Sequence, residues 1–164
     1  MLDAFSIRAR QVVFAARFKA GERGAETIGL DDFLLGLVLE DQEMLGDMFS
    51  EFYEGHGTFS NTAPSHSPFF SPEIAIDLLA KIEGFLSHSE PIDLSTEVPL
   101  SPTLERVFDA AKDIQGKFHY AQIEPLHLLA AILKEESSQG VKLLQEFGIT
   151  QEKIMQRLGS ATGI

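Results

Sequence analysis

The chain has 164 residues, a formal net charge of -12 and no cysteine, which excludes disulfides, thiolate metal sites and thiol nucleophiles. Because phosphate binding depends on clustered lysine and arginine, and no such cluster is present, we expect no nucleic-acid partner. No apolar run reaches the length of a signal peptide or a membrane span, so we expect a cytoplasmic protein that does not bind a membrane.

Apolar residues recur at helical spacing along most of the chain. Ser6 is a typical N-cap for the first helix, and Asp31 and Asp32 lie in the first turn of the second, where carboxylates favour the helix dipole. Ser-Pro pairs that begin at Ser71 and Ser101 start two later helices. We expect eight helices, at residues 7–24, 30–40, 43–54, 71–86, 101–118, 125–136, 138–147 and 150–158.

The chain repeats itself after 95 residues. Residues 5–38 align without a gap on residues 100–133, with seven identities, and apolar positions coincide almost throughout. A duplicated unit explains this match, and two stacked copies bury a continuous core. We therefore expect a single all-α domain of two pseudo-twofold-related four-helix repeats. The expected parts are repeat one at 5–88, a linker at 89–100, repeat two at 101–158 and a flexible tail at 159–164.

The two repeats differ in length. Their fourth helices start 79 residues apart, at Ser71 and Thr150, so the first repeat holds an insertion of 16 residues at 55–70. This segment has the Gly, Ser and Pro content of a loop, and it carries three phenylalanines, Phe59, Phe69 and Phe70. Such side chains either anchor a partner protein or fold back as a lid over the first repeat.

The second repeat carries the most specific sequence features. It begins PLSPTLERVFDAAKD, and the segments HLLAAIL and LLQEFGI follow in order between Pro99 and Leu158. This pattern resembles the Clp N-terminal repeat domain, which is found at the front of Clp-type protein-unfolding ATPases and in free-standing proteins. The resemblance implies a non-catalytic domain without cofactors that docks adaptors, substrates or a Clp unfoldase. From the length, we expect a free-standing accessory or regulator of Clp-type proteolysis.

In some members of that family, a Glu at the start of the second helix and a Thr at the start of the first bind phosphorylated arginine. The matching residues are Ser6 with Asp31 in the first repeat and Ser101 with Leu126 in the second. Because a carboxylate is the natural partner of a guanidinium, the resemblance implies at most one such site, at Ser6 and Asp31. The same residues also fit a structural role, as an N-cap and as an acid in a first helical turn.

Glu124 and His127 have the Glu-x-x-His spacing of di-iron helical proteins. Such a site needs a second copy, but the equivalent residues of the first repeat are Gly29 and Asp32. We therefore expect no metal site and interpret His127 as a histidine of the core. No nucleotide or nucleophile motif predicts a catalytic residue. One other class of function stays open: a small helical enzyme or ligand-binding protein with a pocket under the insertion.

Overall fold

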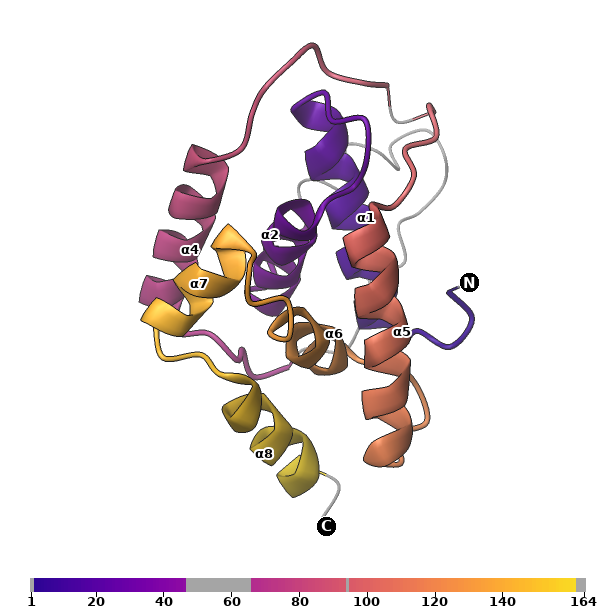
Figure 1. Cartoon of the computed structure of the whole chain (residues 1–164), viewed down its shortest axis with the longest axis vertical. Coiled ribbons are helices and arrows are strands. Elements are labelled where there is room, and N and C mark those ends of the chain that lie inside the picture. The colour runs from indigo at the N-terminus through magenta and orange to yellow at the C-terminus, as the bar shows by residue number, and fades with distance from the viewer. Residues whose placement is uncertain (1, 47–65, 94, 162–164) are drawn as a thin grey trace.

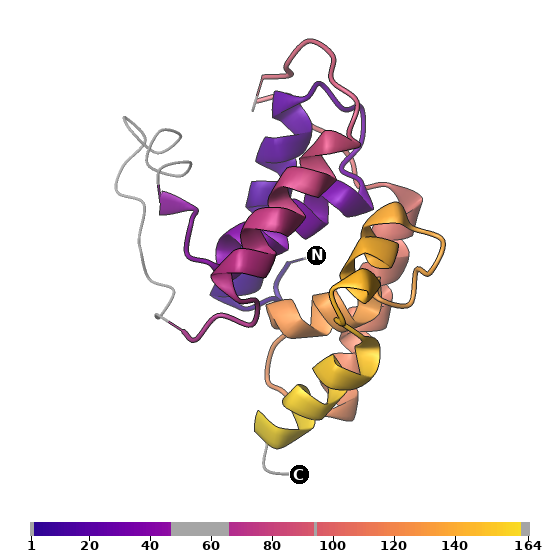
Figure 2. The ribbon, with the colours of Figure 1, turned by 90° about the vertical axis from the view of Figure 1, so that its left-hand side faces the viewer.

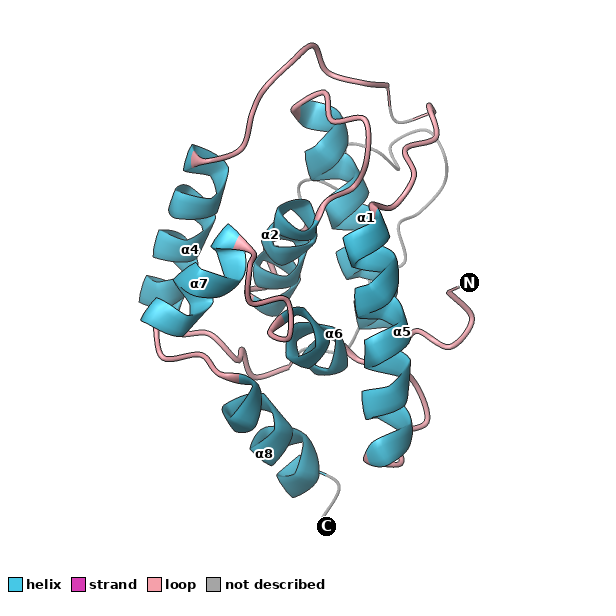
Figure 3. Cartoon of the chain, in the orientation of Figure 1, coloured by secondary structure: helices cyan, strands magenta, loops and turns pink. Residues whose placement is uncertain are grey.

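The computed structural model describes residues 2–46, 66–93 and 95–161. Within them lie seven helices, α1 (Ile7–Glu22), α2 (Leu30–Asp41), α4 (Pro72–Gly84), α5 (Pro102–Lys117), α6 (Pro125–Ile132), α7 (Gln139–Glu146) and α8 (Gln151–Ala161). Loops join these helices, and the described residues form no strand beyond two isolated β-bridges, so the all-α class is confirmed (Figure 3). The expected helix at 43–54 and the insertion lie mostly outside the described residues.

Serine side chains begin several helices, as the sequence predicts. The hydroxyl oxygen of Ser6 accepts the N–H of the third residue after it at 3.1 Å, and Ser101 makes the equivalent contact at 3.2 Å. Ser71 and Ser138 cap α4 and α7 in the same way. Each cap supplies an acceptor for an amide that has no partner within its own helix, and so determines where the helix starts.

Helices α2 and α6 lie at the centre of the domain (Figure 1). Helix α2 packs on α1, α4, α6 and α7, and α6 packs on α1, α2, α5 and α8. Every residue of α2 is buried except Asp31, and every residue of α6 is buried except Leu126. These two residues occupy equivalent positions in the two repeats. The same position of each central helix therefore escapes full burial.

Two parallel β-bridges join the repeats, one between Phe5 and Ile123 and the other between Ile28 and Leu100. A shift of 95 residues converts each bridge into the other. Such reciprocal contacts are what a twofold axis requires, so the bridges confirm the pseudo-twofold arrangement. Figure 2 shows the result: α1, α2 and α4 lie on one side of the domain, and α5 to α8 lie on the other.

The segment between the repeats is held against the end of α1. The amides of Ser89 and Ile92 donate to the carbonyls of Arg23 and Gly21, each at 2.8 Å. Gly24 has a φ of 72°, and a Cβ at this position would lie 2.3 Å from a carbonyl oxygen of the segment, so only glycine fits. None of the described helices is both long enough and apolar enough to cross a membrane.

Candidate functional site

Backbone hydrogen bonds place the serine that starts each first helix beside the other repeat, whereas the sequence pairs it with a residue of its own repeat. The amide of Ser6 donates to the carbonyl of Ile123 at 3.0 Å, so Ser6 lies beside the segment that leads into Leu126. The amide of Ser101 donates to the carbonyl of Ile28 at 2.9 Å, so Ser101 lies beside the segment that leads into Asp31. The start of each first helix thus faces the second helix of the other repeat, because the contacts run across the twofold axis. Ser6 is buried, and its hydroxyl caps α1.

Asp31 points from α2 to the first turn of α7, in the other repeat. A Cβ at Gly140 would lie 2.5 Å from the Oδ1 atom of Asp31, so the carboxylate sits directly against the glycine backbone. Burial and the adjacent Asp32 raise the pKa of Asp31, while Arg23 acts in the opposite direction. The Oδ1 atom is buried and accepts no hydrogen bond from the described residues. Asp31 therefore packs at the contact between the repeats.

Asp32 is fully buried and has a structural set of partners. The Nε and Nη2 atoms of Arg23 donate to its two carboxylate oxygens, each at 2.7 Å. Its Oδ2 atom also accepts the N–H of Gly29 at 2.9 Å, which closes a capping box at the start of α2. Both oxygens are occupied by these contacts, so Asp32 fixes the entry into α2.

His127 performs the equivalent task in α6. Its Nδ1 atom accepts the N–H of Glu124 at 2.8 Å, so this nitrogen carries no proton. The side chain is fully buried, and its ring meets that of Tyr120 edge to face, with 4.5 Å between the centroids. Burial lowers the pKa of His127 to about 4. The described residues contain no group of three or more His, Cys, Asp or Glu side chains that is placed to hold a metal ion.

Phe69 and Phe70 are held by the last residue of α2. The two carboxylate oxygens of Asp41 accept the N–H groups of Phe69 and Phe70 at 2.7 and 3.0 Å. The Phe70 side chain is 4% exposed and belongs to the core, and Phe69 is half-buried against it. These two side chains fold back onto the domain, so Phe70 offers no surface to a partner. Phe59 lies outside the described residues.

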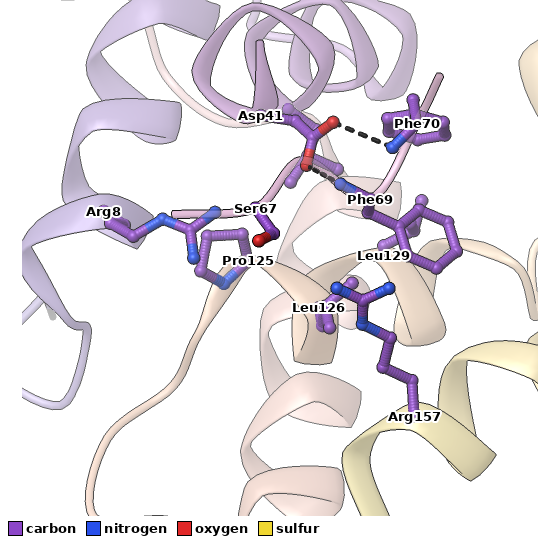
Figure 4. A pocket seen from close by; sticks show the side chains of 10 residues that line it. Arg8, Asp41, Ser67, Phe69, Phe70, Pro125, Leu126, Leu129 and Arg157 are labelled. Atoms are coloured by element: carbon purple, nitrogen blue, oxygen red, sulfur yellow. Dashed lines mark hydrogen bonds between the residues drawn. The ribbon is translucent and has the colours of Figure 1, made fainter. Parts of the chain in front are cut away.

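A small hollow lies beside Phe69, where the two repeats meet (Figure 4). We call it the two-arginine hollow, and its volume is about 70 Å³. Two arginines stand on opposite sides of it in Figure 4, Arg8 of α1 and Arg157 of α8. Its other lining residues are Leu37, Asp41, Ser67, Phe69, Phe70, Pro125, Leu126 and Leu129. Most of this lining is apolar, and Leu126 is the residue of α6 that escapes full burial.

A second depression, which we call the repeat groove, lies where the bridges join the repeats. It has a volume of about 390 Å³, and its lining residues are Ala4, Phe5, Leu100, Glu105, Phe108, Asp109, Lys112 and Ile123. The rings of Phe5 and Phe108 meet edge to face with 5.2 Å between centroids. The three charged residues are exposed on α5. An apolar floor contributed by both repeats thus adjoins a charged rim contributed by the second alone.

The chain resembles one known family in sequence and several solved structures in fold. The family model of the Clp repeat (R) N-terminal domain matches residues 74–147 and 116–164. The chain is similar in structure to the N-terminal domain of the caseinolytic protease associated chaperone ClpD from Arabidopsis thaliana, with 21% identity, a TM-score of 0.57, and coverage of 99% of this chain and 96% of that chain.

Two further solved structures share the fold. For the Hsp104 N-terminal domain from Candida albicans, the identity is 17% and the TM-score 0.57, covering 95% of this chain and 89% of that one. For a chain from preliminary structural investigations of a malarial protein secretion system, the identity is 15% and the TM-score 0.68, covering 97% and 95%. No curated protein matches the sequence. At these identities the structural likeness describes the fold alone.

Proposed function

This chain belongs to the Clp repeat N-terminal domain family, and we propose that it is a protein-interaction module that catalyses no reaction and docks adaptors or substrates of a Clp-type unfoldase. In this proposal it acts as an accessory or regulator of Clp-type proteolysis in the cytoplasm. The observation that carries the proposal is the repeat groove, an open apolar depression that both repeats build.

The floor of the repeat groove suits an apolar side chain of a partner. Phe5 and Ile123 are 2% exposed and form the base of the groove, so the apolar surface open to a partner comes from half-buried Leu100 and from the 9% of Phe108 that is exposed. Contacts with the Phe33 ring, 5.5 Å from that of Phe108, fix the floor from below. Because the floor is rigid before binding, a partner loses little free energy in ordering it.

The rim of the groove indicates the charge of the partner. Glu105 and Asp109 are one helical turn apart on α5 and are both exposed, and Lys112 follows on the next turn. The rim therefore carries an excess negative charge, in keeping with the net charge of -12 for the whole chain. We expect the docked segment to combine apolar side chains with lysine or arginine, because opposite charges steer association and exclude acidic competitors.

The alternative functions have less support. A phosphoarginine reader needs an accessible carboxylate, whereas Asp31 packs against Gly140 and its neighbour Asp32 is paired with Arg23. A small-ligand enzyme with a pocket under the insertion stays a hypothesis that no contact among the described residues favours.

A capture experiment tests the proposal. The chain is immobilised and exposed to a native lysate, and the bound proteins are identified by mass spectrometry for the wild type, for Asp109→Lys and for Glu146→Lys. Asp109 lies on the groove rim, whereas Glu146 is exposed at the end of α7 and supplies the same charge change elsewhere. We expect a Clp unfoldase or Clp adaptor with the wild type and Glu146→Lys, and loss of that protein with Asp109→Lys. Failure to recover any Clp component with the wild type contradicts the proposal.

A further inference from the structure

The two-arginine hollow is chemically different from the repeat groove. The repeat groove has an acidic rim, whereas the hollow is lined by two arginines, by Asp41 and otherwise mostly by apolar side chains. The two depressions share no lining residue. We propose that the hollow binds the carboxylate of an Asp or Glu side chain that is flanked by apolar residues in a partner protein. This second site does not rest on the function proposed for the groove.

Arg157 is the cation that a ligand would meet first. It is exposed on α8, and its guanidinium carbon lies 5.5 Å from the centre of the Phe69 ring. Across the described parts of the chain, no carboxylate forms an ion pair with Arg157, and no acceptor receives a hydrogen bond from its guanidinium. Stacking on an aromatic face holds a guanidinium in position and leaves its N–H donors directed at the surroundings.

Arg8 faces the hollow from the other side and is fixed more firmly. Its Nε and Nη2 atoms donate to the two carboxylate oxygens of Glu40 at 2.8 and 2.9 Å, and Glu40 is buried. This bidentate pair leaves the Nη1 atom with no hydrogen bond to any described residue. Arg8 therefore offers the two N–H groups of a preoriented Nη1 atom, while Arg157 offers the N–H groups of its whole guanidinium.

The acids near the hollow do not compete for Arg157. Both oxygens of Glu40 are bound by Arg8, and both oxygens of Asp41 accept the amides of Phe69 and Phe70. The side-chain amide of Gln42 also donates to Asp41 at 2.9 Å. Because these carboxylates already have their partners, the free polar groups among the described lining residues are the arginine N–H donors and the hydroxyl of Ser67.

The size and lining of the hollow decide which anion fits. About 70 Å³ accommodates one short side chain and not an extended ligand. The apolar walls from Leu126, Leu129 and the Phe69 ring suit the CH₂ groups of an acidic side chain and the apolar neighbours of that residue. A phosphate dianion would be costly to desolvate there, because only one of the two arginines has an unoccupied fork. A carboxylate, with a single charge and two acceptor oxygens, matches this donor set.

The acidity of the whole chain restricts the partner further. With a net charge of -12, the domain repels long acidic segments, and the repulsion grows with each added charge. A single acidic residue among apolar ones avoids most of this repulsion. The ligand of the hollow is therefore an isolated Asp or Glu within an apolar segment, and not an acidic tail.

The test uses a short fluorescein-labelled peptide, blocked at both ends, with one Glu between leucines, and a matched peptide with Gln in place of Glu. Fluorescence anisotropy gives the dissociation constants for the full chain. We expect the Glu peptide to bind at least about tenfold more tightly than the Gln peptide, which is the scale of a charge-assisted bidentate contact. The preference should weaken as NaCl is added.

Three variants locate the site. Arg157→Gln should remove the preference for Glu, and Arg157→Lys should keep only part of it, because lysine retains the charge and loses the fork. Arg106→Gln is the matched control, since Arg106 is an exposed arginine on α5 that does not line the hollow. It should leave the preference intact, and all three variants should leave capture through the repeat groove unchanged.

Several results would overturn the assignment. Equal affinities for the Glu and Gln peptides, no binding of either, or an unchanged preference in Arg157→Gln each contradict a carboxylate site at Arg157. The Gln peptide can also be made with a free C-terminal carboxylate. If it then binds as tightly as the blocked Glu peptide, the hollow does not select the carboxylate of a side chain. Loss of Clp capture with an intact Glu preference would reject the groove proposal alone, so the two failures are distinguishable.

Discussion

Asp32 and His127 stand 95 residues apart and make the same contact. Each accepts the N–H of the residue that precedes its helix, Asp32 from Gly29 at 2.9 Å and His127 from Glu124 at 2.8 Å. A carboxylate and an imidazole thus serve as alternative acceptors at one position of a duplicated capping box. The difference lies in charge, since Asp32 is paired with Arg23 and His127 lies beside the Tyr120 ring.

The neutral His127 predicts that the domain loses stability in mild acid. Its pKa is about 4 in the fold and 6.5 as the reference for an unfolded histidine. Because the folded value is depressed, the unfolded chain binds more protons between these values, and stability falls as the pH drops from 6.5 towards 4. The full loss from this group is about 3 kcal/mol.

Urea unfolding across this pH range measures the effect, with His127→Asn as the comparison. Asn keeps an acceptor for the Glu124 amide but does not titrate. We expect the variant to be less stable at neutral pH and to lose less stability on acidification. The same pH dependence in both proteins would show that His127 does not control it.

The buried Asp32 carboxylate makes Arg23 important for stability. Arg23→Met should lower the free energy of unfolding by about 3 kcal/mol, because it leaves a buried charge without its partner. Adding Asp32→Asn to that variant should restore part of the loss, since the charge is then gone while an acceptor for Gly29 remains. Chemical denaturation of the single and double variants measures the coupling. Additive effects of the two substitutions would contradict the ion pair.

The close contact of α1 with α2 predicts opposite effects for two Gly→Ala changes. A Cβ at Gly36 would lie 2.7 Å from the Val12 carbonyl oxygen, so Gly36→Ala should destabilise the fold by about 1 to 3 kcal/mol. A Cβ at Gly116 in α5 meets nothing within 4 Å, so Gly116→Ala should stabilise it by about 0.5 to 1 kcal/mol. Shifts of the melting temperature in the same direction for both variants, relative to the wild type, would contradict this packing.

The position of Asp31 predicts how the chain responds to free phosphoarginine. Because its carboxylate sits against Gly140, we expect millimolar phosphoarginine to leave the melting temperature unchanged. Thermal denaturation of the wild type and of Asp31→Asn, with and without the ligand, measures this. A rise in the wild type that disappears in Asp31→Asn would restore the phosphoarginine hypothesis.

The sequence predicts the repeated core because local signals agree with the fold. The core is predictable from two kinds of signal. Serine caps and the apolar runs of the central helices depend only on neighbouring residues, and the 95-residue shift reflects duplication. Helix α6 ends at Ile132 and not at the expected residue 136, because tight turns follow, in which the amides of Lys134 and Glu135 donate to carbonyls three residues earlier. The apolar run stops at Leu133, and the residues that follow, Lys134, Glu135 and Glu136, are strong helix formers that give no local signal of an end.

The candidate sites were less predictable, because they depend on contacts between the repeats. Nothing local indicates that Ser6 lies beside Ile123, or that Arg8 and Arg157 share a hollow, since these residues lie far apart in the sequence. One signal was present: Phe5 and Leu100 are equivalent apolar residues just before the first helix of each repeat. Their exchange across the twofold axis forms the floor of the repeat groove.

Site-specific photo-crosslinking tests most directly whether a partner protein docks in the repeat groove. A photo-reactive side chain replaces Lys112, which lines the groove, or Lys142, which is exposed on α7 outside it. With the Clp unfoldase or adaptor recovered by capture, we predict a crosslinked product from position 112 and none from position 142. Crosslinking from position 142 alone, or equal yields from both, would contradict docking in the groove.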